Sequence, residues 1–235
     1  MTFFSDILAR FYRTLIVKDR WLLLLRGLRV TLIIAAVSLV IGVALGVIVA
    51  VVKVAHSQKP KSAALKILNA VCSVYINVIR GTPMVVQLMI MYFVVFASSS
   101  NGVAVAILAF GINSGAYVAE IMRAGILAVD RGQTEAGRSL GLSSFQTMKE
   151  IVLPQAIKNI LPALCNEFIT LLKETSVAGY IAVEDLTKAG DMIRYSTYDA
   201  FVPLVVVALI YLVMVLGLTK IVGIFERRLA RSDNR

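Results

Sequence analysis

Long uncharged stretches separated by short polar ones dominate the pattern of hydrophobic and polar positions along this chain. No residue from Val30 to Val52 is charged, and 23 residues at 1.5 Å each are enough to cross a hydrocarbon core of about 30 Å. The uncharged run between Arg80 and Glu120 is too long for one crossing, and the turn-forming residues 98–102 divide it. The pattern predicts five membrane-spanning helices, at residues 30–52, 67–97, 103–123, 156–178 and 200–219.

The N-terminal segment has a different periodicity. Phe4, Leu8, Phe11 and Leu15 recur at intervals of three or four positions, and the basic residues fall elsewhere on the helical wheel. This pattern is typical of an amphipathic helix that lies on the membrane, and we expect one over residues 3–18. The predicted organisation is an N-terminal interfacial segment (1–29), one transmembrane domain (30–225) containing a polar hairpin (133–154), and a cytoplasmic tail (226–235).

Composition supports an all-α membrane protein. Of the 235 residues 59% are hydrophobic, and the mean hydropathy is +0.84. A net charge of +10 would suggest nucleic acid in a soluble protein, but in a membrane protein Lys and Arg collect in loops and orient the chain, so we expect no nucleic-acid partner.

The distribution of basic residues predicts the orientation. Residues 53–66, residues 123–158 and the tail from Lys220 hold 4, 5 and 5 Lys and Arg, 14 together, whereas the opposite side of the membrane would hold 9. Because basic loops stay in the cytoplasm, we expect the N-terminus outside and the hairpin and C-terminus inside.

The polar hairpin contains several helix-boundary signals. Residues 133–140 are expected to form a short helix with Glu135 in its first turn, where a carboxylate suits the helix dipole. Gly141 suits the left-handed position after a helix. Ser143 and Gln146 have the spacing of a capping box that begins a second helix, and Leu153-Pro154 is expected to end it.

The hairpin also resembles a known signature. In ATP-binding-cassette importers, the permease subunit carries Glu-Ala-Ala, three residues, Gly, nine residues, Ile, one residue and Leu-Pro in a cytoplasmic loop. The same spacing occurs here, with Gly137 at the third position, where Ala is usual. The resemblance implies that the hairpin docks into a separate ATPase subunit. The implied coupling residues are Glu135, Ala136, Gly137, Gly141 and Leu142.

The chain has no phosphate-binding loop of the form Gly, four residues, Gly-Lys-Ser/Thr, so we expect it not to be an enzyme. The resemblance implies that ATP and Mg²⁺ are bound by the partner chain, with no cofactor and no metal site in this one. It also implies two ATPase subunits, a second permease subunit, identical or paralogous, and an extracytoplasmic binding protein. Transport would proceed by alternating access.

Further stretches narrow the match, and they are Ile79 to Pro83 with Val86 to Leu88, Gly115 to Ile121 with Arg123 to Ile126, and Asn166 to Phe168 with Leu172 to Ser176. They resemble the polar amino acid permeases, the histidine and glutamine type, over about residues 27–228. This implies the type I importer (MetI-like) fold in a bacterial inner membrane, with an amino-acid-binding protein as partner. Two alternatives remain open: the same machine importing cystine, an opine or another small polar solute, or a stand-alone secondary transporter or channel.

Ionisable residues within spans are functional candidates because burying charge in lipid is costly. Glu167 is a candidate to bind the ammonium or cationic side chain of an amino acid, or else to form a structural ion pair with Arg80. Arg80 precedes the expected bend at Pro83 and could face substrate or join two helices. Asn113, Ser114 and Tyr117 are candidates for a polar path, whereas Glu120 and Arg123 are expected to pair or to lie at the interface.

Two pairs of glycines, Gly42 with Gly46 and Gly111 with Gly115, have the spacing that lets membrane helices approach closely. We interpret them as packing seams within one subunit.

Overall fold

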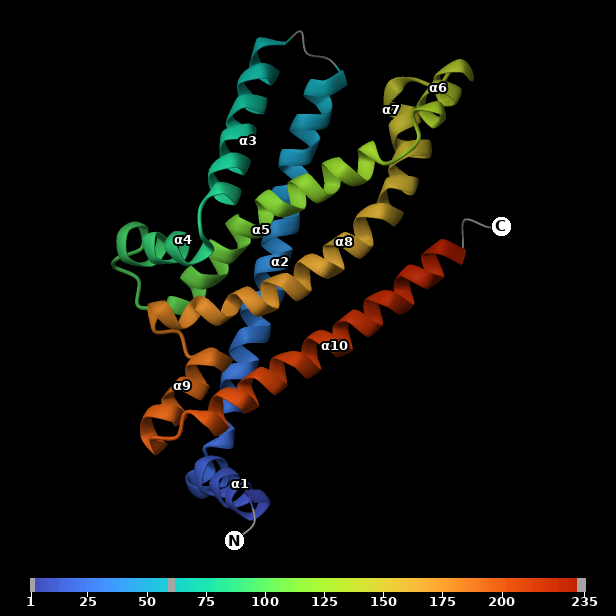
Figure 1. Cartoon of the computed structure of the whole chain (residues 1–235). Coiled ribbons are helices and arrows are strands. Elements are labelled where there is room, and N and C mark those ends of the chain that lie inside the picture. The colour runs from blue at the N-terminus through green and yellow to red at the C-terminus, as the bar shows by residue number, and fades with distance from the viewer. Residues whose placement is uncertain (1–2, 59–61, 232–235) are drawn as a thin grey trace. The chain divides into compact units, whose positions relative to one another are not determined.

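The computed structural model describes residues 3–58 and 62–231, and these form ten α-helices and short helical turns without a strand (Figure 1). The all-α prediction is therefore confirmed. Lys59, Pro60 and Lys61 of the predicted basic loop, and the last residues of the predicted tail, lie outside the described residues. The helices are α1 (Phe3–Phe11), α2 (Trp21–Gln58), α3 (Ala63–Gly81), α4 (Met84–Ile90), α5 (Gly102–Leu127), α6 (Arg131–Ser139), α7 (Ser144–Thr147), α8 (Leu153–Glu174), α9 (Leu186–Thr197) and α10 (Phe201–Arg231).

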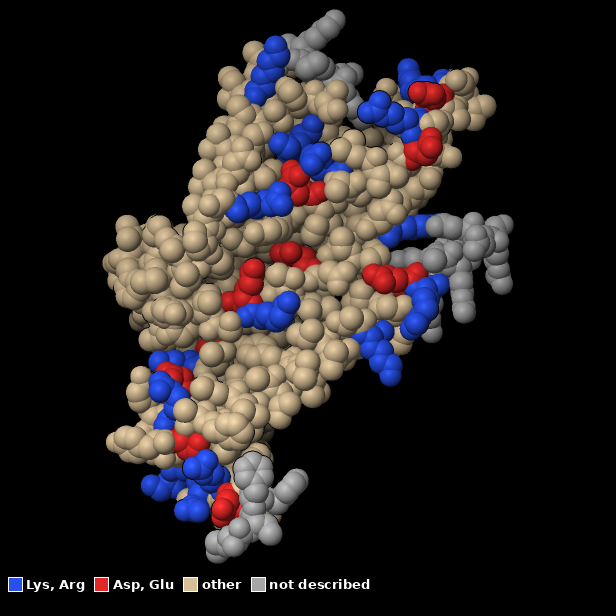
Figure 2. Space-filling model, in the orientation of Figure 1, with Lys and Arg blue, Asp and Glu red and all other residues tan. Residues whose placement is uncertain are grey.

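Four of the described helices, α2, α3, α5 and α10, are long and apolar enough to cross a membrane. They coincide with the first, second, third and fifth predicted spans, and most of the face seen in Figure 2 is uncharged. Helix α2 begins at Trp21, well before the predicted Val30. The fourth predicted span corresponds to α8, which is long enough but contains Lys158, Glu167 and Lys173 and is not among the four.

The second predicted span, 67–97, is not one continuous helix. Helix α3 ends at Gly81, Thr82 and Pro83 adopt extended backbone angles, and α4 begins at Met84. Proline lacks an N–H group and disfavours helical angles in the residue before it. The bend predicted at Pro83 is therefore correct, and it divides the predicted span into two helices.

The N-terminal segment is also more broken than its periodicity predicts. Helix α1 ends at Phe11 and is followed by a wide helical turn, Tyr12–Ile16, and a tight one, Val17–Asp19. Within the tight turn Lys18 has a φ of 62°, a left-handed conformation that interrupts a helix.

The chain divides into two compact units, each built from three separated stretches. Residues 1–38, 83–110 and 169–218 form the first unit, and residues 39–82, 111–168 and 219–235 form the second. In the first unit, Leu15 and Leu24 share a core with residues of α9 and α10. In the second, Val49, Ile76 and Ala116 join the parts of α2, α3 and α5 that belong to it.

Helix α9 is capped by a buried aspartate and joined to α2 in the first unit by a backbone hydrogen bond. The Asp185 carboxylate accepts hydrogen bonds from the backbone N–H groups of Thr187 and Lys188, which caps α9. The N–H of Leu186, the first residue of α9, donates to Thr31 Oγ1 on α2 at 3.1 Å. Burial raises the pKa of the Asp185 carboxyl above its ordinary value, although the hydrogen bonds from the Thr187 and Lys188 N–H groups oppose the shift.

The glycine pairs form a seam between α2 and α5 in the second unit. A Cβ at Gly46 would lie 2.5 Å from Val118 Cγ1, and one at Gly42 would lie 2.7 Å from Ser114 Oγ. Gly111 and Gly115 of α5 face Ile41 and Leu45 of α2 in the same way. The predicted packing seam within one subunit is confirmed, because only glycine leaves room for this approach.

Candidate functional site

The first helix of the hairpin, α6, begins earlier than the sequence indicates. Asp130 is its N-cap and accepts a hydrogen bond from Gly132 N at 2.6 Å. Because the helix starts at Arg131, Glu135 lies beyond the first turn, and the prediction that it occupies that turn is wrong. The side chains of Glu135 and Ala136 are exposed.

Helix α6 ends in a Schellman motif around Gly141. Leu142 N donates to Gly137 O at 3.2 Å, and Gly141 N donates to Arg138 O at 3.1 Å. The φ of Gly141 is +86°, as predicted for a left-handed position, and nothing lies within 4 Å of the place where its Cβ would be. Arg138 Nη1 also donates to Leu142 O at 2.6 Å, which holds the turn from its outer side.

The second helix begins at the predicted capping box. Gln146 N donates to Ser143 Oγ, and Ser143 N donates to Gln146 Oε1. The expected stop at Leu153-Pro154 is wrong, since α7 continues through a wide helical turn, Met148–Val152, into α8. A proline is tolerated in a first helical turn, and wide turns of this kind interrupt the regular hydrogen-bond ladder.

Gly137 is the point where the two arms of the hairpin touch. A Cβ there would lie 2.8 Å from both Thr147 Cγ2 and Ile151 Cδ1, so the position requires a very small residue. The substitution of Gly for the usual Ala therefore accompanies a close contact between α6 and the second arm.

Two exposed apolar side chains on the hairpin were not singled out by sequence reasoning. Leu140 is 81% exposed and Phe145 is 75% exposed, on either side of the Gly141 turn. Large apolar side chains on an otherwise polar segment commonly mark a surface that contacts another protein. The sequence signal that could have identified them is the occurrence of two large apolar residues in a charged, turn-rich stretch.

Among the candidate pathway residues, Ser114 and Glu167 are brought together. Ser114 Oγ on α5 donates to Glu167 Oε1 on α8 at 2.8 Å. Ser114 is fully buried, Asn113 is 3% exposed, and Glu167 is partly buried. The carboxylate is thus held by a neutral donor from a neighbouring helix.

Arg80 and Tyr117 belong to a second cluster. Arg80 lies over the Tyr117 ring, 5.2 Å from its centroid, and its Nη1 is 4.0 Å from Glu120 Oε2. Glu120 also accepts from Arg123 at 2.8 Å, which confirms the expected pairing of these two residues. The ionic partner of Arg80 is Glu120, so the suggested Arg80–Glu167 pair is wrong. The pairing favours the interpretation that Arg80 joins α3 to α5.

A basic cavity of about 480 Å³ lies beside the base of the hairpin, and sequence reasoning missed it. Lys53, Arg123 and Arg131 line it, and Lys53 Nζ donates to Ser73 Oγ at 3.0 Å. The cavity brings together residues from α2, α3, α5 and the hairpin, which are far apart in sequence. It belongs to the second unit, as do the whole hairpin and all the candidate pathway residues.

Residues 42–231 match the family described as binding-protein-dependent transport system inner membrane component. The chain belongs to this family. It is therefore a multi-pass inner-membrane transport subunit and not an enzyme, and the predicted relationship to binding-protein-dependent importers is confirmed. The match includes the hairpin and every candidate pathway residue.

Individual members of the family are similar over nearly the whole length. The arginine transport system permease protein ArtQ of Bacillus subtilis (strain 168) is 39% identical, over 89% of this chain and 94% of that protein. The glutamine transport system permease protein GlnP of Escherichia coli (strain K12) is 36% identical, over 88% of this chain and 93% of that protein. A crystal structure of an amino acid ABC transporter with histidines is 41% identical, with a TM-score of 0.82 over 97% of this chain and 99% of that one. This likeness confirms the predicted permease fold.

Proposed function

We propose that this chain is the membrane-spanning permease subunit of an ATP-driven importer of polar amino acids, which an extracytoplasmic binding protein delivers. The observation that carries the proposal is the hairpin, a rigid helix, turn and helix that presents Leu140 and Phe145 to a partner. The relatives named for arginine and glutamine transport support the cargo class. Two ATPase subunits bind ATP and Mg²⁺, and a second permease subunit, identical or paralogous, completes the pathway.

The hairpin is well suited to transmit movement. Its turn is held by backbone hydrogen bonds around Gly141, and its arms touch at Gly137. The second arm continues without a break into α8, which carries Glu167. A displacement of the hairpin by closing ATPases is therefore passed along one helix to the candidate pathway, as alternating access requires.

The orientation follows from the charges. With the N-terminus outside and the C-terminus inside, the hairpin faces the cytoplasm, where the ATP is. In the family to which this chain belongs, the inner-membrane component works with a binding protein, which would meet the opposite face.

Glu167 is our candidate for the group that binds the cationic part of the cargo. A carboxylate within a span attracts an ammonium or guanidinium, and Ser114 fixes the position of one of its oxygens. Asn113 and Tyr117 lie on the same helix as Ser114, and we retain them as candidates to line the route, whereas we assign Arg80 the structural role of joining α3 to α5.

The test of the coupling role uses the complex reconstituted with its ATPase and binding protein. Leu140→Ser and Phe145→Ser remove the exposed apolar side chains of the hairpin, and Tyr195→Ser, at a residue of α9 with 65% exposure, is the matched control. We expect both hairpin variants to lose ATPase association and uptake by tenfold or more, since losing an interface anchor costs about 2 kcal/mol. Equal uptake in all three variants would contradict the docking role.

The cargo is tested by measuring how far binding protein loaded with each of the twenty amino acids, or with cystine, stimulates the ATPase. Stimulation by arginine, histidine or glutamine supports a polar amino acid importer. If none of the amino acids stimulates the ATPase, the proposal that the cargo is an amino acid is contradicted. Uptake by the purified chain without any ATPase would favour the stand-alone transporter instead.

A further inference from the structure

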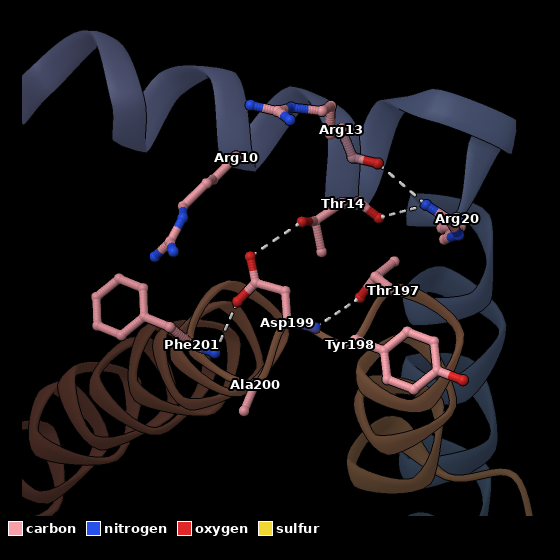
Figure 3. A pocket seen from close by; sticks show the side chains of 9 residues that line it. All are labelled: Arg10, Arg13, Thr14, Arg20, Thr197, Tyr198, Asp199, Ala200 and Phe201. Atoms are coloured by element: carbon pink, nitrogen blue, oxygen red, sulfur yellow. Dashed lines mark hydrogen bonds between the residues drawn. The ribbon is translucent and has the colours of Figure 1, made fainter. Parts of the chain in front are cut away.

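A cavity of about 790 Å³ lies in the first unit, far in sequence from the hairpin and the candidate pathway (Figure 3). One side comes from the N-terminal segment, and the other from the turn between α9 and α10. Five of its lining residues are exposed, so the cavity is open to the surface: Arg10, Arg13, Tyr198, Ala200 and Phe201. Its volume is in the range of sites that hold small ligands or headgroups.

The cavity is strongly basic. Arg10, Arg13 and Arg20 line it, against a single acid, Asp199. Both oxygens of Asp199 already accept hydrogen bonds, one from Thr14 Oγ1 and the other from the first backbone N–H groups of α10. Within the part of the chain that the structure describes, no ion pair joins any of the three arginines to a carboxylate.

Arg13 and Arg20 are oriented by hydrogen bonds to the backbone and keep N–H donors for a ligand. Arg20 Nη1 donates to the carbonyls of Arg13 and Thr14, and Arg13 Nε donates to Ala9 O. A guanidinium has five N–H donors, so each of these side chains keeps several. Figure 3 shows the Arg10 side chain reaching from the N-terminal helix toward Phe201 and Asp199.

Large apolar side chains are exposed in the segments that line the cavity. Phe201 lines it and is 58% exposed, and Phe11 and Trp21, each 41% exposed, directly follow the lining residues Arg10 and Arg20 in the chain. Trp21 and Phe201 are also the first residues of α2 and α10, two helices that are apolar enough to span a membrane. The cavity therefore lies beside the first residues of two helices that are apolar enough to span a membrane, and at such helix ends we expect lipid headgroups and an enrichment of tryptophan.

We propose that this cavity binds the phosphodiester headgroup of an anionic phospholipid. The phosphate lies among Arg10, Arg13 and Arg20, because guanidinium groups match phosphate oxygens in bidentate hydrogen bonds. The acyl chains run along Phe201, the exposed aromatic residue of the lining, and along the apolar start of α10. An acidic protein would satisfy the arginines but would leave this apolar surface without a partner, so the lipid fits better.

The first experiment compares two double variants that remove equal charge. Arg10→Gln with Arg13→Gln alters the cavity, and Arg26→Gln with Arg29→Gln alters exposed arginines of α2 that do not line it. The transporter complex is purified and placed in nanodiscs of phosphatidylcholine with or without phosphatidylglycerol, and lipid retained after detergent exchange is measured by mass spectrometry. We expect the cavity variant to bind phosphatidylglycerol about 30-fold more weakly, from about 1 kcal/mol per arginine, and the control to bind normally. Equal losses in both variants, or none in the cavity variant, would overturn the proposal.

A second measurement needs no variant. Photoactivatable phosphatidylglycerol added to the wild-type complex should label residues around Leu8 to Tyr12 and Phe201, and labelling confined to other segments would contradict the site.

Two further measurements distinguish a lipid headgroup from a free anion and from a docking protein. Inorganic phosphate at the same concentration should not displace the lipid, and displacement would show a site for a free anion. The loaded binding protein should stimulate the cavity variant as it does the control. A defect in that stimulation with unchanged lipid retention would assign the arginines to protein docking.

Discussion

Ser114 on α5 donates a hydrogen bond to Glu167 on α8, with 2.8 Å between Ser114 Oγ and Glu167 Oε1. The two residues are 53 positions apart in the chain, and both belong to the unit that carries the hairpin. The bond connects the helix that follows the hairpin with the helix that precedes it. Under the proposed function, it lies where movement of the hairpin and occupancy of the candidate pathway would influence each other.

Removing the charge at this pair should change cargo preference. In Glu167→Gln we expect KM for arginine to rise tenfold or more, because hydrogen bonds to charged groups contribute about 1.5–3 kcal/mol, with a smaller change for glutamine. Ser114→Ala keeps the carboxylate and should raise KM by about fivefold, from about 1 kcal/mol for one hydrogen bond. The measurement is uptake by the reconstituted complex. An unchanged KM for both amino acids in Glu167→Gln would show that Glu167 is not part of the binding site.

The cluster around Arg80 should behave as a structural contact. Arg80→Gln should lower stability by about 1 kcal/mol or less, because its side chain is 43% exposed and the Glu120 oxygen is 4.0 Å away. KM should stay unchanged, because the Arg80 contacts are with α5. Thermal unfolding and uptake measured together test this, and a KM effect without a loss of stability would assign Arg80 to the substrate route.

The glycine seam provides a packing test with an internal control. Gly46→Ala puts a methyl group 2.5 Å from Val118 Cγ1, and overpacking of this kind typically costs about 1–3 kcal/mol. At Gly217 in α10 nothing lies within 4 Å of the Cβ position, so Gly217→Ala should be neutral or stabilising by up to about 1 kcal/mol. Thermal unfolding in detergent separates the two, and similar midpoints for both variants would contradict the close approach of α2 and α5.

At Gly141 the cost of substitution is conformational and not steric. Its φ of +86° is unfavourable for alanine by about 1–2 kcal/mol, whereas asparagine tolerates the left-handed region better. We expect Gly141→Ala to reduce ATP-coupled uptake and Gly141→Asn to retain most of it, at equal membrane insertion. Equal uptake for the two would show that the turn geometry does not control coupling.

The buried Asp185 should make stability depend on pH. Its pKa is raised in the folded state, so the folded state holds the proton more tightly, and stability falls as pH rises from about 4, the ordinary carboxyl value, through the raised one. Asp185→Asn keeps a capping oxygen and should lose this decline. Asp185→Ala also loses the decline, and because it lacks the cap it should be less stable than Asp185→Asn by about 1 kcal/mol at every pH.

The measurement for Asp185 is thermal unfolding followed by the fluorescence of Trp21, the single tryptophan of the chain. A difference between wild type and Asp185→Asn that does not vary with pH would contradict the effect of burial on this carboxyl group.

Local signals were enough for the features that depend on neighbouring residues. Uncharged runs predicted four spans that correspond to long apolar helices, and the capping box at Ser143 and the left-handed turn at Gly141 were both correct. Each of these depends on contacts within a few positions of the chain. Local signals failed where a competing local preference was stronger, as at Asp130, which begins α6, and at Pro154, through which the helix continues.

The sequence by itself determined that the chain is an all-α membrane protein with a capped helix-turn-helix hairpin, because hydropathy and capping are properties of short segments. Only the tertiary structure decided which charges meet. It paired Arg80 with Glu120 and joined Ser114 to Glu167, and it collected Arg10, Arg13 and Arg20 in one cavity. Such pairings depend on how separate segments pack, and a charged side chain within a span reveals that it needs a partner but not which helix supplies one.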